Sequence, residues 1–289
     1  TLHIAERIIL NDAQDKAKSI IVIDQKDGSR RKIDGELFIF CSSTIQTLKI
    51  LLNSNEKSIE KGFIDPSESL GTKLMDHIST CRFFSFPYKK EKSKSKSLES
   101  DQILSGAGSF FIPLGNKVHH NKNLNFIRGY GIWGGIGRFE PPDFLKKDRN
   151  SKIGFLIGHG EVLPYKNNKV SLSNTLDRWG SPIPYISCEW RDNEKEMVKH
   201  MNNTIEEYIS MSGGNIAPIN ELLNVPFLKS YSNRSLAIRE EASPPGYYIH
   251  EVGGAPMGAS KESSVLDKWN RLWQCLNVLV VDGACWTTS

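Results

Sequence analysis

Near its carboxyl end the chain reads Asn277-Val278-Leu279-Val280-Val281-Asp282-Gly283-Ala284. The apolar run is short and rich in valine, which is typical of a strand that is buried on both faces of a parallel sheet. An acidic residue and a glycine follow it, and open α/β sheets bind ligands at the carboxyl ends of their strands. Asp282 can accept a hydrogen bond from a ribityl or ribose hydroxyl, while Gly283 and Ala284 let phosphate oxygens approach backbone N–H groups. The same residues also fit a solvated Asp-Gly turn, and both interpretations stay open at this point.

A second buried-strand pattern precedes a helix in the first part of the chain. Residues 36–41 form a short apolar run, and the hydroxyl residues 42–44 that follow can cap a helix. The next apolar residues, at positions 45, 48, 51 and 52, recur at helical spacing. A buried strand that leads into a helix suits an α/β dinucleotide-binding sheet, because phosphates are favoured at the N-terminus of such a helix.

Hairpin and mixed patterns fill the rest of the chain. We expect strands near residues 2–10 and 19–24 and a turn at Asp27-Gly28 that pairs residues 31–34 back as a hairpin. Residues 80–245 contain short alternating runs, scattered glycines and prolines, and one clear helix from about 193 to 212. This middle region is therefore predicted to be α+β, with an antiparallel sheet and helices to one side.

A GxGxxG motif occurs at residues 129–134. A dinucleotide fingerprint requires a helix directly after this motif, whose N-terminus holds the pyrophosphate. Residues 135–142 contain two glycines and two prolines and do not predict a helix. We therefore interpret the motif as a glycine-rich strand or loop.

Composition and charge describe an ordinary globular protein. The chain has 289 residues, of which 38% are hydrophobic and 24% charged, values that argue against disorder or a fibrous repeat. No apolar run approaches about 18 residues, so no membrane span is predicted. The sequence starts at Thr1, and no basic-then-apolar leader follows, so no signal peptide is visible in it.

The net charge of +4 arises from residues 89–97, which contain five lysines and one glutamate. Because a Lys/Ser run cannot bury apolar area, we predict a solvated loop. Nucleic-acid binding is the alternative, but the run has no interleaved aromatic or arginine side chains, so we expect no nucleic-acid partner. The five cysteines, at positions 41, 81, 188, 275 and 285, are widely spaced without a CxxC. This pattern argues against a metal site or a disulfide framework and favours buried thiols in a reducing, cytoplasmic compartment.

His250 is the most distinctive of the seven histidines. Aromatic and apolar residues precede it and a run of small residues follows, so it can be held rigidly while a ligand reaches its ring. An imidazole takes and returns protons near neutral pH, which suits general acid–base catalysis. A purely structural histidine is the alternative. The pair His119-His120 is expected to be solvated, and His159, which lies between two glycines, is expected in a turn.

The order of these motifs resembles the carboxyl-terminal part of the glucose–methanol–choline (GMC) oxidoreductases, which are FAD enzymes that oxidise alcohols and sugars. The late signature of that family has a His, a Gly-Thr, a Met-Gly, an "sVLD" segment and an "nLyVvDgs.fPts" segment. The matching residues here are His250, Gly253-Gly254, Met257-Gly258, residues 264–267 and residues 277–289. Residues 40–47 resemble its "AAGAleTprlL" and residues 71–77 its "GrnlmDH". Residues 128–131 and 176–184 are similar to a bacterial branch with a pyranose-oxidase-like substrate domain.

The resemblance implies an α/β and α+β fold, with the late part of a Rossmann-like FAD-binding domain and a substrate domain with a mixed or antiparallel sheet. The implied domains are 1–79, part of the FAD-binding domain; 80–245, the substrate domain; and 246–289, which returns to the FAD-binding domain. His250 is then the active-site base that accepts the hydroxyl proton while hydride passes to flavin N5. The implied FAD contacts are Asp282, Gly283 and Ala284 at the pyrophosphate and ribityl chain, with Cys41, Ser42 and Ser43 nearby.

This chain also departs from the family pattern. Gly254 stands where Thr is usual, Pro256 replaces a common Arg, and residues 41–43 replace an Ala-Gly-Ala that lies close to FAD. The family's amino-terminal GxGxxG is absent, and the family continues past the match to Ser289 into a motif with a second catalytic residue. The resemblance therefore implies a fragment, inactive alone, of an enzyme for an alcohol, sugar or polyol whose electron acceptor is oxygen, a quinone or a cytochrome. A non-catalytic homologue and a carbohydrate-binding protein built on residues 80–245 stay as alternatives.

Overall fold

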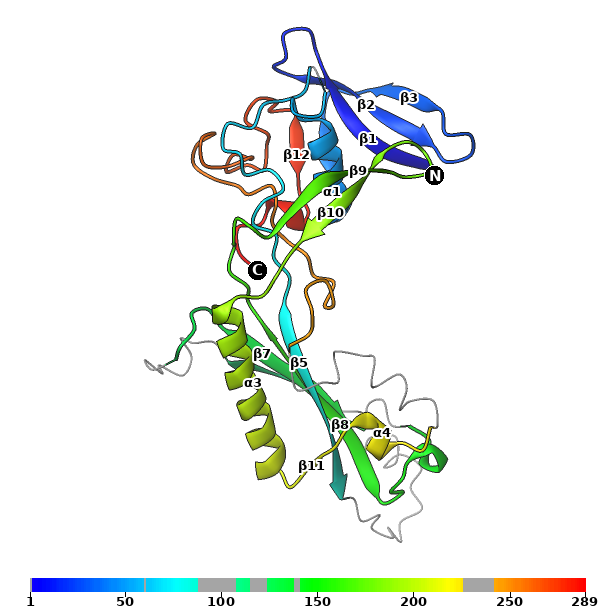
Figure 1. Cartoon of the computed structure of the whole chain (residues 1–289), viewed down its shortest axis with the longest axis vertical. Helices are drawn as coiled ribbons and strands as arrows, with labels where there is room; N and C mark the ends of the chain where they lie inside the picture. The colour runs from blue at the N-terminus through cyan, green and yellow to red at the C-terminus, as the bar shows by residue number, and fades with distance from the viewer. Residues whose placement is uncertain (1, 60, 88–107, 115–123, 138–140, 226–241) are drawn as a thin grey trace, which may run out of the picture. The chain divides into compact units, whose positions relative to one another are not determined.

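A computed structural model describes residues 2–59, 61–87, 108–114, 124–137, 141–225 and 242–289 (Figure 1). The Lys/Ser run and the pair His119-His120 lie outside these residues. The chain divides into two compact units. Unit 1 contains residues 1–76, 162–189 and 249–289, and unit 2 contains residues 77–161 and 190–248. Residues 162–189, which we expected with the middle region, therefore pack in unit 1.

Unit 1 begins with an antiparallel meander of β1 (His3–Leu10), β2 (Ala17–Asp24) and β3 (Arg30–Asp34). Gly28 adopts φ +75°, a conformation that glycine reaches without strain, in the turn between β2 and β3. The hairpin predicted at Asp27-Gly28 is thus confirmed.

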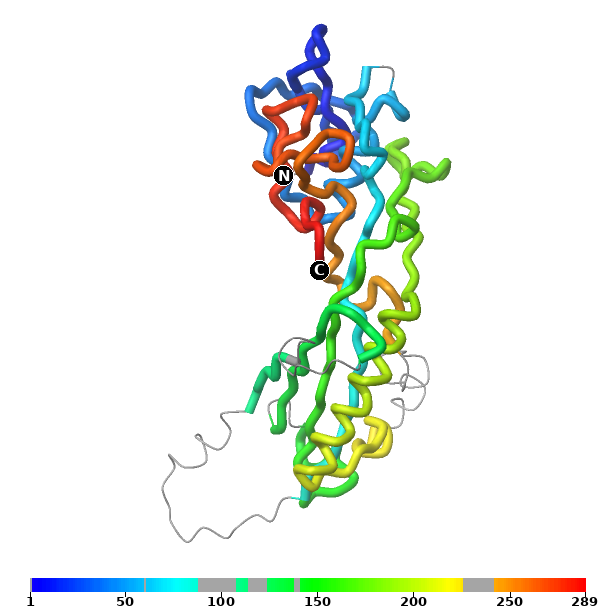
Figure 2. The backbone as a smooth tube through the Cα atoms, turned by 90° about the vertical axis from the view of Figure 1, so that its left-hand side faces the viewer, coloured from blue at the N-terminus to red at the C-terminus, as the bar shows by residue number. Residues whose placement is uncertain are grey.

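Unit 1 also contains a two-stranded parallel pair and a helix; Figure 2 shows the red carboxyl-terminal part of the chain beside the blue amino-terminal part in this unit. The strands β4 (Phe38–Phe40) and β12 (Val278–Val280) pair in parallel although 237 residues separate their ends. The helix α1 (Thr44–Asn53) follows β4 and buries Leu48 and Leu51 in the core that also contains both strands. Both predicted strands and the helix after the first are confirmed, but β4 is buried on one face only, because Ile39 is 55% exposed. A short 3-10 turn, η3 (Gly283–Cys285), follows β12.

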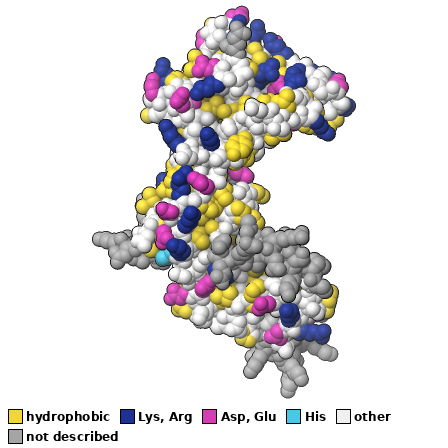
Figure 3. Space-filling model, in the orientation of Figure 1, with side chains coloured by type: hydrophobic (Ala, Val, Ile, Leu, Met, Phe, Trp, Pro, Cys, Tyr) yellow, Lys and Arg dark blue, Asp and Glu magenta, His cyan; other side chains and the backbone are white. Residues whose placement is uncertain are grey.

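The hairpin of β9 (Lys169–Leu176) and β10 (Pro182–Ser187) completes unit 1. Contacts that attach it include the Val170 N–H, which donates to the Gly71 carbonyl at 2.7 Å, the Lys49–Asp177 pair at 3.3 Å, and Arg30, which donates to the Trp179 carbonyl at 3.1 Å. On the face shown in Figure 3, the basic and acidic side chains of this unit are interspersed.

Unit 2 is an antiparallel sheet with strand order β11-β5-β8-β7-β6. Its strands are β5 (Ile78–Pro87), β6 (Gly108–Leu114), β7 (Tyr130–Ile136), β8 (Ser151–Gly160) and β11 (Asn215–Ile216). The helix α3 (Asp192–Met211) contacts β5, β7 and β8, and the short helices η1 (Asp143–Leu145) and α4 (Ile219–Leu222) complete the unit. This is the antiparallel sheet with helices that the middle region predicted.

Glycines let helix α3 pack closely on β8. A Cβ added at Gly158 would lie 2.2 Å from the Met201 sulfur, and one at Gly160 would lie 2.3 Å from the Met197 sulfur. Both methionines are fully buried. The GxGxxG motif forms strand β7, as the sequence indicated, and the next helical element in the described residues is the three-residue η1, which begins at Asp143. In the part of the chain that the structure describes, each helix is too short or too polar to cross a membrane.

Candidate functional site

The carboxyl ends of β4 and β12 lie side by side. The Val281 N–H donates to the Phe40 carbonyl at 2.9 Å, which extends the parallel pairing by one step. Residues 41–43 therefore leave one strand where residues 281–284 leave the other. The side chains of Cys41, Ser42 and Ser43 are exposed. This is the place at which open α/β sheets bind their ligands.

Helix α1 begins at this strand end without the expected cap. Ser43 occupies the N-cap position with φ +72°, and its side chain makes no capping hydrogen bond. The Thr47 hydroxyl instead accepts from the Ser42 N–H at 3.2 Å. The first turn of α1 contains no acidic residue, so the backbone N–H groups at this end favour an anion.

Asp282 joins the turn after β12 to helix α1. Its Oδ2 accepts from the Thr47 hydroxyl at 2.6 Å, and its Oδ1 accepts from the Ala284 N–H at 3.0 Å. Ala284 is fully buried. A Cβ added at Gly283 would lie 2.5 Å from the Thr44 hydroxyl oxygen. Only glycine therefore fits this turn without displacing its neighbour.

The His250 segment runs between two other pieces of unit 1. On one side Met75 and Val252 exchange hydrogen bonds of 2.8 and 2.9 Å, and the Gly71 N–H donates to the Gly254 carbonyl. On the other side the Gly253 N–H donates to the Gly283 carbonyl at 2.8 Å. The imidazole of His250 is exposed, and its backbone N–H donates to Asp76 Oδ1 at 3.1 Å.

Thr44 connects all three groups of predicted site residues. Its hydroxyl donates to the Glu251 carbonyl at 2.5 Å, next to His250, while the same oxygen borders Gly283. Thr44 directly follows residues 41–43. Thr44, Thr47 and Asp76 were not among the predicted site residues, although Thr44 was expected to help cap the helix, and in the structure all three connect site segments. Thr44 and Thr47 lie one helical turn apart at the start of α1, and that spacing was the available signal.

Gly254 has a local physical explanation. It adopts φ +97°, and an added Cβ would lie 2.4 Å from Leu48 Cδ1. Because Leu48 is fully buried, it has little room to move. The glycine that replaces the family's usual threonine thus matches the packing of this chain.

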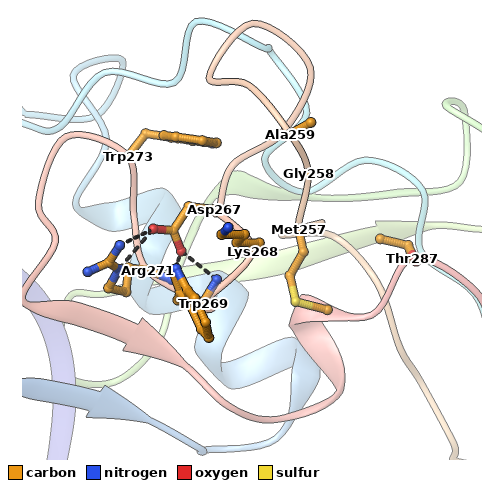
Figure 4. Close-up of a pocket in the computed structure, with 9 residues that line it drawn as sticks. All are labelled: Met257, Gly258, Ala259, Asp267, Lys268, Trp269, Arg271, Trp273 and Thr287. Carbon is orange, nitrogen blue, oxygen red and sulfur yellow. Dashed lines mark hydrogen bonds and ion pairs between the residues drawn. The ribbon is translucent and has the colours of Figure 1, made fainter.

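A pocket of about 750 Å³ lies elsewhere in unit 1 (Figure 4). None of the predicted site residues lines it; its lining residues are Met257, Gly258, Ala259, Asp267, Lys268, Trp269, Arg271, Trp273 and Thr287. Asp267 is buried and pairs with Arg271 at 2.7 Å. Burial works against ionisation here, but hydrogen bonds from the Arg271 side chain and from backbone N–H groups outweigh it and lower the pKa of Asp267.

His159 differs from its sequence-based expectation. His159 lies in strand β8, not in the expected turn, because the flanking glycines serve the packing of α3. Its ring centre lies 5.3 Å from that of His77 and 5.4 Å from that of Tyr248, and all three residues belong to unit 2.

The five cysteines are free thiols, but only Cys275 and Cys285 are buried, so the expectation of buried thiols holds for part of the set.

Comparison with known proteins agrees with this geometry. Residues 164–289 match the family model of the GMC oxidoreductases. The chain is 24% identical to a 2-methyl-1,2-propanediol dehydrogenase of Mycolicibacterium austroafricanum, over 95% of this chain and 48% of the relative. It is 21% identical to the large subunit of a fructose dehydrogenase of Gluconobacter japonicus, over 96% of this chain and 47% of that protein.

A solved structure shares the fold. It is a formate oxidase of Aspergillus oryzae, studied for modification of its FAD, with a TM-score of 0.58 and 14% identity over 98% of this chain and 56% of the oxidase. The chain spans about half the length of the curated relatives that it matches. The α/β and α+β fold expected from the sequence is confirmed. Residues 164–289 are therefore similar to the carboxyl-terminal region of the GMC oxidoreductases.

Proposed function

We propose that this chain forms part of an FAD-dependent oxidoreductase that acts on a CH–OH group of an alcohol, sugar or polyol, with His250 as the base. The observation that supports it most is the hydrogen bond from Thr44 to the Glu251 carbonyl. It ties the His250 segment to the strand ends where the proposed FAD would be held. The diol and fructose dehydrogenases among the relatives support the substrate class.

The residues at the strand ends fit an FAD phosphate and polyol chain. Exposed residues 41–43 lead into the uncapped end of the ten-residue helix α1, which favours an anion. A carboxylate has about four lone-pair sites, so Asp282 retains capacity for a ligand hydroxyl beyond its bonds to Thr47 and Ala284. Because the Ala284 N–H already donates within the chain, we assign the direct contacts to Asp282 and Gly283, with Ala284 supporting their turn.

In this proposal a residue of this chain accepts the hydroxyl proton of the substrate. When bound, FAD supplies the acceptor for the hydride of the carbinol carbon. The exposed His250 side chain takes the hydroxyl proton on an imidazole nitrogen, and the electron pair of the O–H bond forms the carbonyl. The backbone pairing of residues 71–75, 252–255 and 283–284 orders the segment that follows His250, and the His250 N–H donates to Asp76; fixed geometry of this kind lowers the barrier.

The test uses the purified gene product that contains this chain. We expect visible flavin absorbance and its bleaching by 1,2-propanediol or fructose without oxygen. His250→Ala should slow flavin reduction by a factor on the order of 10² or more in a single turnover. His3→Ala is the matched control, because His3 lies in the meander of unit 1 and contacts Asp24 at 3.6 Å. A flavin-free protein would contradict the FAD proposal, and an unchanged rate in His250→Ala would contradict the role of His250.

A further inference from the structure

Asp76 is a buried carboxylate that contacts the backbone of His250. It is 2% exposed, and its Oδ1 accepts the His250 N–H at 3.1 Å. Asp76 follows Met75, which is paired with Val252 in both directions. The carboxylate is therefore placed by the same backbone pairing that orders the residues after His250.

The residue before His250 has a strained backbone. Ile249 adopts φ +57°, a region in which a β-branched side chain is a genuine outlier. The left-handed conformation is unfavourable for such a residue, because its Cβ comes too close to the following carbonyl oxygen. The Ile249 side chain is 72% exposed, so packing of that side chain does not compensate the strain. A strained conformation of this kind persists only where its surroundings impose it.

The strained backbone of Ile249 and the hydrogen bond from His250 to Asp76 belong to the same turn. The bend at Ile249 sets the direction in which the chain enters His250, and the bond to Asp76 holds the next N–H in that direction. Loss of this acceptor removes the hydrogen bond that fixes the His250 N–H and lets the turn relax towards an extended backbone; the next backbone hydrogen bonds along the described segment are those of Val252 with Met75. Relaxation would turn the imidazole away from its present position.

We propose that Asp76 is a positioning residue that holds the left-handed turn at Ile249 and thereby aims the His250 imidazole. This proposal rests on the proposed function for the part that concerns the reaction. The hydrogen bond between the His250 N–H and Asp76 does not depend on the proposed function. Misplacement of a catalytic group by about 1 Å can cost about 10²-fold in rate.

The contact is tested first by amide hydrogen exchange in the whole gene product. Although the His250 side chain is exposed, its N–H should exchange slowly in the unmodified protein and at least tenfold faster in Asp76→Ala. Asp76→Asn retains an Oδ1 acceptor and should keep most of the protection. An unprotected His250 amide in the unmodified protein would overturn the proposal without any variant, so a variant that does not fold leaves the test intact.

The kinetic test is a double-mutant cycle on flavin reduction with Asp76→Ala and His250→Ala. We expect Asp76→Ala to lower the rate by about 10-fold to 100-fold with flavin content unchanged. Added to His250→Ala, it should cause no further loss, because it acts through that side chain. If Asp76→Ala lowers the rate of flavin reduction by the same factor in the unmodified protein and in His250→Ala, the change acts by general destabilisation and the positioning role is overturned. A His250→Ala variant with the unmodified rate would instead refute the proposed function, while the exchange result would still decide the contact.

Discussion

The Thr47 hydroxyl donates to Asp282 Oδ2 across 2.6 Å and so links helix α1 to the turn after β12. The two residues are 235 positions apart in sequence. The same hydroxyl accepts the Ser42 N–H, which places one side chain between both strand ends. A hydrogen bond to a charged acceptor contributes more than one between neutral groups.

Thr47→Val should therefore destabilise the chain while keeping its shape. Thr47 is fully buried, and the change removes the hydroxyl without altering the volume much. We expect the free energy of unfolding in urea to fall by about 1.5–3 kcal/mol. Thr288→Val is the control, because Thr288 is exposed and should change it by less than about 0.5 kcal/mol. Equal effects of the two changes would contradict the importance of this bond.

Gly254→Thr restores the residue that the family usually has and should nevertheless be harmful. The position combines φ +97° with an added Cβ only 2.4 Å from Leu48. We expect a loss of more than about 2 kcal/mol in the free energy of unfolding, from backbone strain and overpacking. Gly246→Thr separates the two causes, since Gly246 has φ +82° but no atom within 4 Å of an added Cβ. Gly246→Thr should therefore reduce the free energy of unfolding by less than Gly254→Thr does. A Gly254→Thr variant as stable as the unmodified protein would refute the packing argument.

The Asp267–Arg271 pair should make stability depend on pH. Because the folded-state pKa of Asp267 is lowered, its contribution is present above the unfolded pKa of about 3.9 and is lost as the pH falls through the folded value. Asp267→Asn should reduce the free energy of unfolding by on the order of 1–3 kcal/mol at neutral pH. In urea unfolding at several pH values, the difference from the unmodified protein should narrow in acid. If this difference in the free energy of unfolding widens in acid, the pKa of Asp267 is raised in the folded protein and not lowered.

The cysteines should differ in reactivity. Loss of contact with water raises the pKa of Cys275, which is buried, and of Cys81, which is partly buried, to about 12, so little reactive thiolate is present at neutral pH. Cys41 is exposed. In timed alkylation followed by peptide mass spectrometry, Cys41 should be labelled first, and Cys81 and Cys275 only after addition of urea. Early labelling of Cys275 in the folded protein would contradict its burial.

Local pattern was enough to predict many elements. The strand patterns in residues 2–34 predicted the strands and the hairpin of β2 and β3, and helical spacing from Ile45 to Leu52 predicted α1. The glycines and prolines around residues 135–142 correctly argued against a nucleotide-binding loop at residues 129–134. These features depend on neighbours in sequence, since period, turn chemistry and chain breakers act within a few residues.

Long-range packing decided the rest. The sequence alone identified strand ends and a distinctive histidine, but the pairing of β4 with β12 and the bonds of Asp76 and Thr44 exist only once distant segments meet. The same holds for Gly254, whose lack of a side chain is explained by Leu48. Residue type and spacing determine which local structure a segment prefers, whereas hydrogen bonds and steric limits between segments far apart in sequence require the folded chain.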